Sequence, residues 1–344
     1  MKRSISAFLL ICACMLALAG CKSGQKEKPP DPEPEPQEET FTLPLTGLQT
    51  NDQDTYESRP VAVVVNNDPK ARPQTGLNEA DVIFEVLAEG NITRYLAIFQ
   101  SEKPEAVGPV RSARPYFIDL ANGYDAFFVA HGYSPEAKMM LDSGAIDHIN
   151  GIAYDGTLFQ RASFRKAPHN SYITYENIAK GAEENGHSLV KTVPPLLFLS
   201  EEEMDGIQGD SAAEATVRYS SSYSVTYSYD EAANEYTRWI GSEQMADYET
   251  NEPKTLANIL IIEANHRILD DVGRKEIDLA SGGNAILLQN GKVRQLQWAN
   301  ENGRIVPKTS EGAVGFVPGQ TWIHIVPASP GLNQIVQLSN KETE

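Results

Sequence analysis

The chain has 344 residues and a formal net charge of −18, from 29 basic and 47 acidic side chains. This balance argues against a nucleic-acid partner, because phosphate backbones require a net basic face. The three cysteines all lie within the first 21 residues. The rest of the chain therefore cannot form a disulfide, use a thiol nucleophile or bind a metal through cysteine.

The first 21 residues have the pattern of a lipoprotein export signal. Two basic residues precede an apolar run from Ile5 to Ala19, which is shorter than the roughly 18–20 residues that a membrane span needs. The run closes with Leu-Ala-Gly-Cys, ending at Cys21. The sequence predicts a cleaved signal peptide at residues 1–20 and a lipid on Cys21, which would anchor the mature chain to the extracytoplasmic face of the cell membrane.

Residues 21–58 begin with alternating proline and acidic residues, from Lys28 to Pro36. Such a segment forms neither a helix nor a strand ladder, and extends as polyproline II at about 3.1 Å per residue. We expect a disordered acidic tether that separates the folded part from the bilayer. The acidic run could also be a binding segment.

Residues 59–205 carry helix and strand signals in alternation. The first strand is predicted at 61–65, because five β-branched or small apolar residues follow one another there. A hairpin is expected around Gly90-Asn91. Further predictions are a strand at 127–130 and helices at 115–122, 134–142 and 174–186, placed by their caps and closing glycines. This segment is predicted to be an α/β layered domain with a mixed sheet.

Residues 206–334 change in character. Residues 223–229 alternate with period two, as in a half-buried strand. A hairpin is predicted around Asn290-Gly291, and strands at 256–262 and 322–326. We therefore expect a mainly antiparallel β domain, followed by a tail at 335–344, and an α+β fold for the chain as a whole.

The strongest candidate for a binding site is the segment from Gly108 to Pro115. It places Arg111, Ser112 and Arg114 at the start of a predicted helix, within an acid-free stretch of an acidic chain. Free backbone N–H groups, the helix dipole and two guanidinium groups would together bind a carboxylate or phosphate. Alternatively, the arginines pair with acids from neighbouring elements and only stabilise the fold.

Two further candidates lie nearby in the sequence. A second acid-free stretch, residues 156–175, contains His169 and Asn170, and loops of this kind often bind ligands. His131 follows a predicted strand at its carboxyl end, the edge at which α/β sheets bind ligands. The alternatives are a solvated loop and a histidine with no role beyond the fold.

The hairpin around Gly90-Asn91 suggests an ion pair. A two-residue turn would place Leu87 opposite Arg94, so that Arg94 shares a face with Glu85 and Glu89. Glu85 and Arg94 alternate with apolar neighbours. We expect a partly buried structural pair between them, of a kind that is also retained at some binding sites.

Tests for known enzyme signatures are negative. The sequence contains no Gly-x-Ser-x-Gly, P-loop, His-Glu-x-x-His or dinucleotide fingerprint. The tetrapeptide 163–166 fits Ser-x-x-Lys but lacks its companion motifs. The six histidines show no metal-ligand spacing. Neither a metal nor a cofactor is expected.

Several of these stretches resemble the YerB-like bacterial lipoproteins, a family of two domains of unknown function. The resemblance rests on residues 61–67 with Pro69, and on 89–94, 108–115, 131–132, 168–170, 283–298 and 318–323. One difference is Asn91, where the family pattern has a second glycine; asparagine also tolerates positive φ. The resemblance implies an exported, lipid-anchored envelope protein, and it implies no reaction.

The leading hypothesis is a non-enzymatic envelope lipoprotein that binds an anionic cell-wall component or a wall-synthesis protein. Arg94, Arg111, Arg114, His131 and His169 should then converge on one cleft. The alternative is a hydrolase acting on a wall polymer, with a histidine as base and arginines stabilising charge. A third hypothesis is a protein–protein adaptor that uses an apolar patch or sheet edge of the β-rich half.

Overall fold

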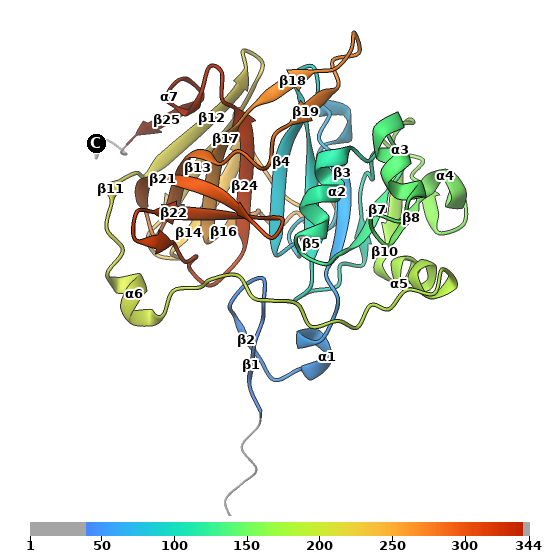
Figure 1. Ribbon diagram of the computed structural model, residues 1–344, viewed down its shortest axis with the longest axis horizontal. Helices are drawn as coiled ribbons and strands as arrows, with labels where there is room; N and C mark the ends of the chain where they lie inside the picture. Colours follow the sequence, from blue (N-terminus) through green and yellow to red (C-terminus); the bar gives the residue numbers. More distant parts are fainter. Residues whose placement is uncertain (1–38, 340–344) are drawn as a thin grey trace, which may run out of the picture. The chain divides into compact units, whose positions relative to one another are not determined.

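A twelve-stranded mixed sheet is the centre of the protein and takes strands from both halves of the chain (Figure 1). The computed structural model describes residues 39–339. In spatial order, the strands are β23 (Gly312–Ala313), β22 (Arg304–Thr309), β21 (Lys292–Glu301), β20 (Gly283–Gln289), β17 (Asn258–Ala264), β24 (Thr321–Pro327), β4 (Val82–Glu89), β5 (Ile92–Phe99), β3 (Val61–Asn66), β7 (Phe127–Ala130) and β8 (His148–Asn150), with β11 (Asp210–Ser211) beside β21.

Strand β24 joins the two halves of this sheet. It lies parallel to β17 on one side and to β4 on the other, with Ile323 between Leu260 and Phe84. Six of its seven residues are buried. Such a fully buried apolar run is typical of a central parallel strand.

A second, antiparallel sheet packs on one face of the central sheet. It consists of β15 (Glu243–Gln244), β14 (Glu235–Ile240), β13 (Tyr223–Asp230), β12 (Glu214–Ser220), β25 (Val336–Ser339) and β16 (Thr255–Leu256). Every second residue of β13 points inward, so Tyr223, Val225 and Tyr227 join a core that includes Val63 and Ile261 of the central sheet.

Helices cover the part of the central sheet formed by β3, β5, β7 and β8 (Figure 1). Helices α2 (Pro115–Asn122) and α3 (Pro135–Asp142) pack on the face opposite the second sheet. Helix α5 (Tyr175–Glu184) and the small sheet of β6 (Ala106–Val107), β10 (Ser171–Thr174) and β9 (Phe159–Arg161) contribute to the other core. These elements enclose the carboxyl ends of β3, β7 and β8.

The predicted fold class is confirmed: an α/β layered part with a mixed sheet is followed by mainly antiparallel β structure. The predicted helices form, and Ser134 and Thr174 cap α3 and α5 through their hydroxyl oxygens as expected. Both predicted hairpins are present, as β4–β5 and β20–β21. Alternating polarity and turn residues were sufficient to place these elements.

Two expectations at the ends of the folded part were wrong. Residues 39–58 were expected in the tether, but they form β1 (Phe41–Thr42), β2 (Gln49–Thr50) and α1 (Gln53–Tyr56). Leu43 and Leu45 are 6% and 1% exposed, and this apolar burial holds the segment in place. Residues 335–339 were expected in a tail, but β25 pairs with β12.

Other predictions lie outside the described residues: the signal peptide, the lipid on Cys21 and the first part of the tether. Among residues 39–339, no helix is long and apolar enough to cross a bilayer. The domain boundary at residue 205 stays a prediction, since both halves belong to one compact unit and share a sheet.

Candidate functional site

Three parallel strands end together at the edge where the sequence predicted a site. Strands β3, β7 and β8 run in the same direction, and their carboxyl ends carry Asn66, His131 and Asn150. In open α/β sheets, ligands bind in the crevice beyond the carboxyl ends of parallel strands. This edge is therefore the first place to look for binding chemistry.

The segment 108–114 crosses this edge and is fixed to it by backbone hydrogen bonds. The Arg111 N–H donates to Val64 O at 2.8 Å, and the His131 N–H donates to Arg111 O at 3.0 Å. The Arg111 guanidinium is partly exposed and has no hydrogen-bond or ion-pair partner within residues 39–339. Burial and the charge of Arg94 lower the pKa of Arg111 to about 10, against the opposing charge of Asp68. It is a cation with unused donors.

Arg94 and Arg114 have a different environment, because both pair with Glu89. Arg94 Nη2 lies 2.6 Å from Glu89 Oε2, and Arg114 Nη2 pairs with Glu89 Oε1. Arg94 also donates to Ser112 O at 2.8 Å, and both arginines are buried, at 3% and 7% exposed. Their guanidinium groups hold the fold at this edge, as the alternative reading of the sequence proposed for Arg114.

His131 is held in one tautomer by its two neighbours. Its Nε2 accepts from Arg161 Nη2 at 3.0 Å, since arginine can only donate. Its Nδ1 therefore carries the proton and donates to Ser171 Oγ at 2.7 Å. Burial and the charge of Arg161 lower the pKa of His131. Both ring nitrogens are therefore engaged, and Arg161 and the buried Ser171 hold the ring in place.

His169 keeps one nitrogen available. Asn66 Nδ2 donates to its Nδ1 at 3.0 Å, so Nε2 carries the proton. Burial lowers the pKa of His169, against the opposing charge of Asp68 and with the help of Arg111. The neighbouring Asn170 instead accepts from Arg161 at 3.2 Å and donates to Ala162 O. Asn170 therefore orders the loop.

Ser112 also has a structural contact. Its Oγ donates to His131 O at 3.1 Å. A Cβ added at Gly132 would lie 2.6 Å from Ser112 Oγ, so the close approach of Ser112 requires glycine at position 132. The predicted residues thus divide into two groups: Arg111 and His169 have free donors, whereas Arg94, Ser112, Arg114, His131 and Asn170 are committed to neighbours. Ligand binding at this edge stays a prediction.

The expected pair between Glu85 and Arg94 does not form. A β-bulge between Leu87 and Glu89 shifts the register, so Arg94 lies opposite Val86 and Leu87 lies opposite Thr93. Glu85 and Arg94 therefore point to opposite faces of the sheet. Each still has an ion pair, but with a partner other than the predicted one.

Glu85 belongs to a buried polar cluster that the sequence did not predict. Its Oε2 lies 2.8 Å from Arg238 Nη2 and 3.2 Å from Trp322 Nε1, and Tyr223 donates to its Oε1 at 2.5 Å. Burial opposes its charge, but Arg238 and the hydrogen bonds from Tyr223 and Thr93 outweigh burial and lower the pKa of Glu85. The signal was present in the alternation of β14, where Arg238 shares the inward phase of Tyr236.

No group of three or more histidine, cysteine, aspartate or glutamate side chains that could hold a metal ion occurs in the described part of the chain. The candidate edge carries guanidinium, imidazole and amide donors. Such donors bind anions.

Comparison with known proteins places the chain. Residues 45–188 match the protein of unknown function (DUF3048) N-terminal domain, and residues 215–323 match the corresponding C-terminal domain. The chain belongs to the DUF3048 family. A member named "Putative lipoprotein YerB" from Bacillus subtilis (strain 168) is 52% identical over 287 residues, covering 83% of this chain and 86% of the relative.

The crystal structure of YerB from Bacillus subtilis matches this family member with a TM-score of 0.81 at 50% identity. The match covers 87% of this chain and all of the crystallised one. The resemblance noted in the sequence is thereby confirmed. The matched N-terminal domain contains all of the candidate edge residues from Asn66 to Asn170.

Proposed function

We propose that this protein is a lipid-anchored envelope lipoprotein that binds an anionic group of a cell-wall component at the carboxyl edge of β3, β7 and β8. The observation that supports this most is the Arg111 guanidinium, which has no partner within residues 39–339. A partly buried cation loses hydration, and a structural role would normally provide a carboxylate in return. An anion from outside the chain would supply that partner.

The surrounding groups support the same proposal. His169 Nε2–H is a second free donor, and the charge of Arg111 acts on His169. The charge of Asp68 acts on both Arg111 and His169, but Asp68 forms no ion pair with either within the described residues, and its side chain accepts from the Lys70 N–H at 2.9 Å. Lipid attachment at Cys21 is the second element of the proposal, and it is supported by the lipobox and by the name of the Bacillus subtilis relative.

The test uses the full-length chain purified in detergent and two anionic probes, N-acetylmuramic acid for a carboxylate and sn-glycerol 3-phosphate for a phosphate. We expect calorimetry to detect binding of at least one probe. Arg111→Gln should weaken it roughly tenfold or more, the loss typical of a charged hydrogen bond.

The matched control is Arg218→Gln. Arg218 is exposed on β12 and its side chain makes no hydrogen bond or ion pair within the described residues, so its removal should leave the affinity unchanged. Equal affinities for wild type and Arg111→Gln would contradict the proposal, as would the absence of binding to both probes.

A further inference from the structure

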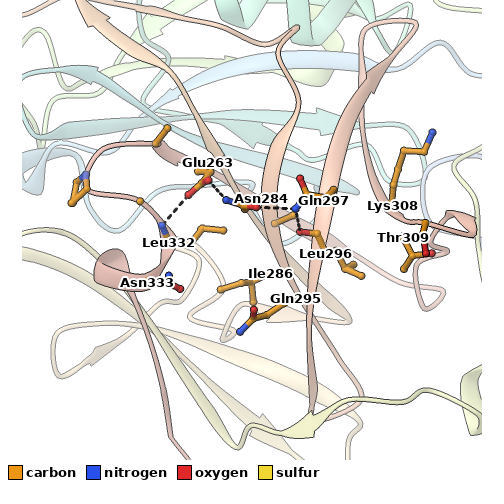
Figure 2. Close-up of a pocket in the computed structure, with 15 residues that line it drawn as sticks. Glu263, Asn284, Ile286, Gln295, Leu296, Gln297, Lys308, Thr309, Leu332 and Asn333 are labelled. Carbon is orange, nitrogen blue, oxygen red and sulfur yellow. Dashed lines mark hydrogen bonds between the residues drawn. The ribbon is translucent and has the colours of Figure 1, made fainter.

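A row of four polar side chains crosses the opposite half of the central sheet. Asn284 on β20 pairs with Gln297 on β21, which pairs with Lys308 on β22. Glu263 on β17 continues the row, one residue beyond the pair of Ile262 with Ala285. Four neighbouring strands give the row a length of about 14 Å. Figure 2 shows these side chains lying along the floor of one cleft.

The cleft above this row has a volume of about 590 Å³. Residues of the segment 328–333 line the cleft, as do Thr309 and Ser310. Figure 2 shows Thr309 at the end of the cleft opposite Leu332 and Asn333. Gln295 and Ile286 complete the floor beside the row, as Figure 2 shows. None of the described residues that line the cleft is aromatic.

The two charged members of the row already have partners. Glu263 accepts from Asn284 Nδ2 through Oε1, and from the Leu332 N–H through Oε2 at 3.1 Å. Lys308 Nζ lies 2.6 Å from Glu301. Gln297 donates to Asn284 Oδ1 at 2.8 Å. Glu301 therefore neutralises Lys308, whereas Glu263 keeps its negative charge with both oxygens hydrogen-bonded. These contacts also fix the amide side chains of Asn284 and Gln297 in position.

The remaining donors and acceptors are uncharged. The side chains of Gln295, Ser310 and Asn333 have no hydrogen-bond partner within the described residues, and Gln297 Oε1 is also unused. Amide and hydroxyl groups can each donate and accept, which suits the hydroxyl and acetamido groups of a sugar. An anionic ligand would find no free cation here.

We propose that this cleft binds a neutral glycan strand, at a site separate from the arginine edge. A row of about 14 Å suits a short oligosaccharide lying across the strands. The cleft has one carboxylate among its described lining residues, and both of its oxygens are engaged. Glycoside hydrolysis generally requires two carboxyl groups, so the site binds rather than cleaves. Without an aromatic stacking surface, the affinity should be modest.

The test titrates the full-length chain in detergent with chitotetraose, a neutral tetramer of β-1,4-linked N-acetylglucosamine. Binding is followed by saturation-transfer NMR. We expect Gln295→Ala and Gln297→Ala each to weaken binding roughly fivefold, the loss of one neutral hydrogen bond. Both side chains are exposed, so the variants should fold normally. Gln244→Ala on the exposed β15 edge is the matched control and should bind as wild type does.

Two outcomes would overturn the proposal: no binding of chitotetraose at millimolar concentration, or the same affinity in the Gln295→Ala and Gln297→Ala variants as in wild type. Arg111→Gln should leave chitotetraose binding unchanged. A loss of chitotetraose binding in that variant would instead place the sugar at the arginine edge and remove the case for a second site.

Discussion

His324 is a histidine that the fold keeps uncharged. Its side chain is fully buried between two tyrosines, with Tyr219 Oη 2.8 Å from Nδ1 and Tyr227 Oη 2.6 Å from Nε2. Burial lowers the pKa of His324 to about 4, although Glu85 opposes this shift. A neutral ring donates to one tyrosine and accepts from the other, and protonation would remove the acceptor.

This environment predicts a pH-dependent contribution to stability. The unfolded chain takes up a proton at the ordinary histidine pKa of about 6.5, whereas the folded chain does so only near 4. The stabilisation is therefore complete above pH 6.5 and is lost as the pH falls toward 4. It amounts to about 3 kcal/mol. In urea unfolding, the difference in free energy of unfolding between wild type and His324→Gln should narrow by about this amount as the pH falls from 7 to 4.

The comparison with a variant is needed because Asp81 acts in the opposite direction. Burial raises the pKa of Asp81 to about 6, so acidification through this window stabilises the fold at that residue. In the free energy of unfolding of wild type alone, the loss at His324 and the gain at Asp81 largely cancel as the pH falls. The assignment of a neutral His324 would be contradicted if the difference in free energy of unfolding between wild type and His324→Gln stayed constant from pH 7 to pH 4.

At the scale of elements, the junction between β8 and α4 (Gly151–Tyr154) determines where His131 lies. A Cβ added at Gly151 would lie 2.3 Å from Cγ and Nδ1 of the His131 ring. No real Cβ makes so close a contact, so the ring could not stay beside Ser171. Gly151, at the start of α4 after the edge strand β8, therefore sets the position of the His131 side chain at the end of the neighbouring strand β7.

We predict that Gly151→Ala lowers the free energy of unfolding by about 1–3 kcal/mol, the typical effect of overpacking. Gly206→Ala is the control, because a Cβ there meets only Glu203 O at 3.5 Å and Glu202 O at 3.6 Å, both ordinary contacts. Denaturant midpoints measure both variants. Equal midpoints for the two variants would show that the His131 ring has room to move.

For the whole molecule, the shared sheet makes the two halves depend on each other. Strand β4 of the first half has β24 of the second half as its parallel neighbour. Glu85 and Arg238, which also come from different halves, are both fully buried. Separating the halves would expose a strand edge and leave each buried charge without its partner.

We therefore expect that residues 39–205 and 206–344, made as separate chains, do not unfold cooperatively on their own. Mixing them should restore one cooperative transition, because the sheet can then form between them. Circular dichroism during urea unfolding measures this. A cooperative transition for either fragment alone would contradict the prediction and would support independently folding domains.

Local patterns in the sequence predicted the three longest helices and most strands of the central sheet. Turn dipeptides placed the hairpins, and Ser134 and Thr174 placed two helix starts, because caps and turns depend on a few adjacent residues. The candidate edge was also found locally, since a histidine after a strand and a basic acid-free segment are both visible in the chain. Arg111 was one of the residues predicted in this way, and the structure then showed that its guanidinium has no partner within residues 39–339.

Contacts between distant segments could not be predicted in the same way. The β-bulge after Leu87 reversed the face of Arg94, and nothing in the local sequence signals one extra residue. Arg238 lies far along the chain from Glu85, so no spacing rule links them. The polar row of Glu263, Asn284, Gln297 and Lys308 likewise depends on the register of four strands.

The position of β24 also has a consequence for how the chain is made. Strand β4 is synthesised early, but its parallel neighbour β24 begins only at Thr321, which pairs with Val82. At usual rates of protein synthesis, on the order of tens of seconds separate the two strands. During that interval β4 has a free edge able to pair with other chains. Newly made chains must stay apart, or be kept unfolded, until the last strand arrives and closes the sheet.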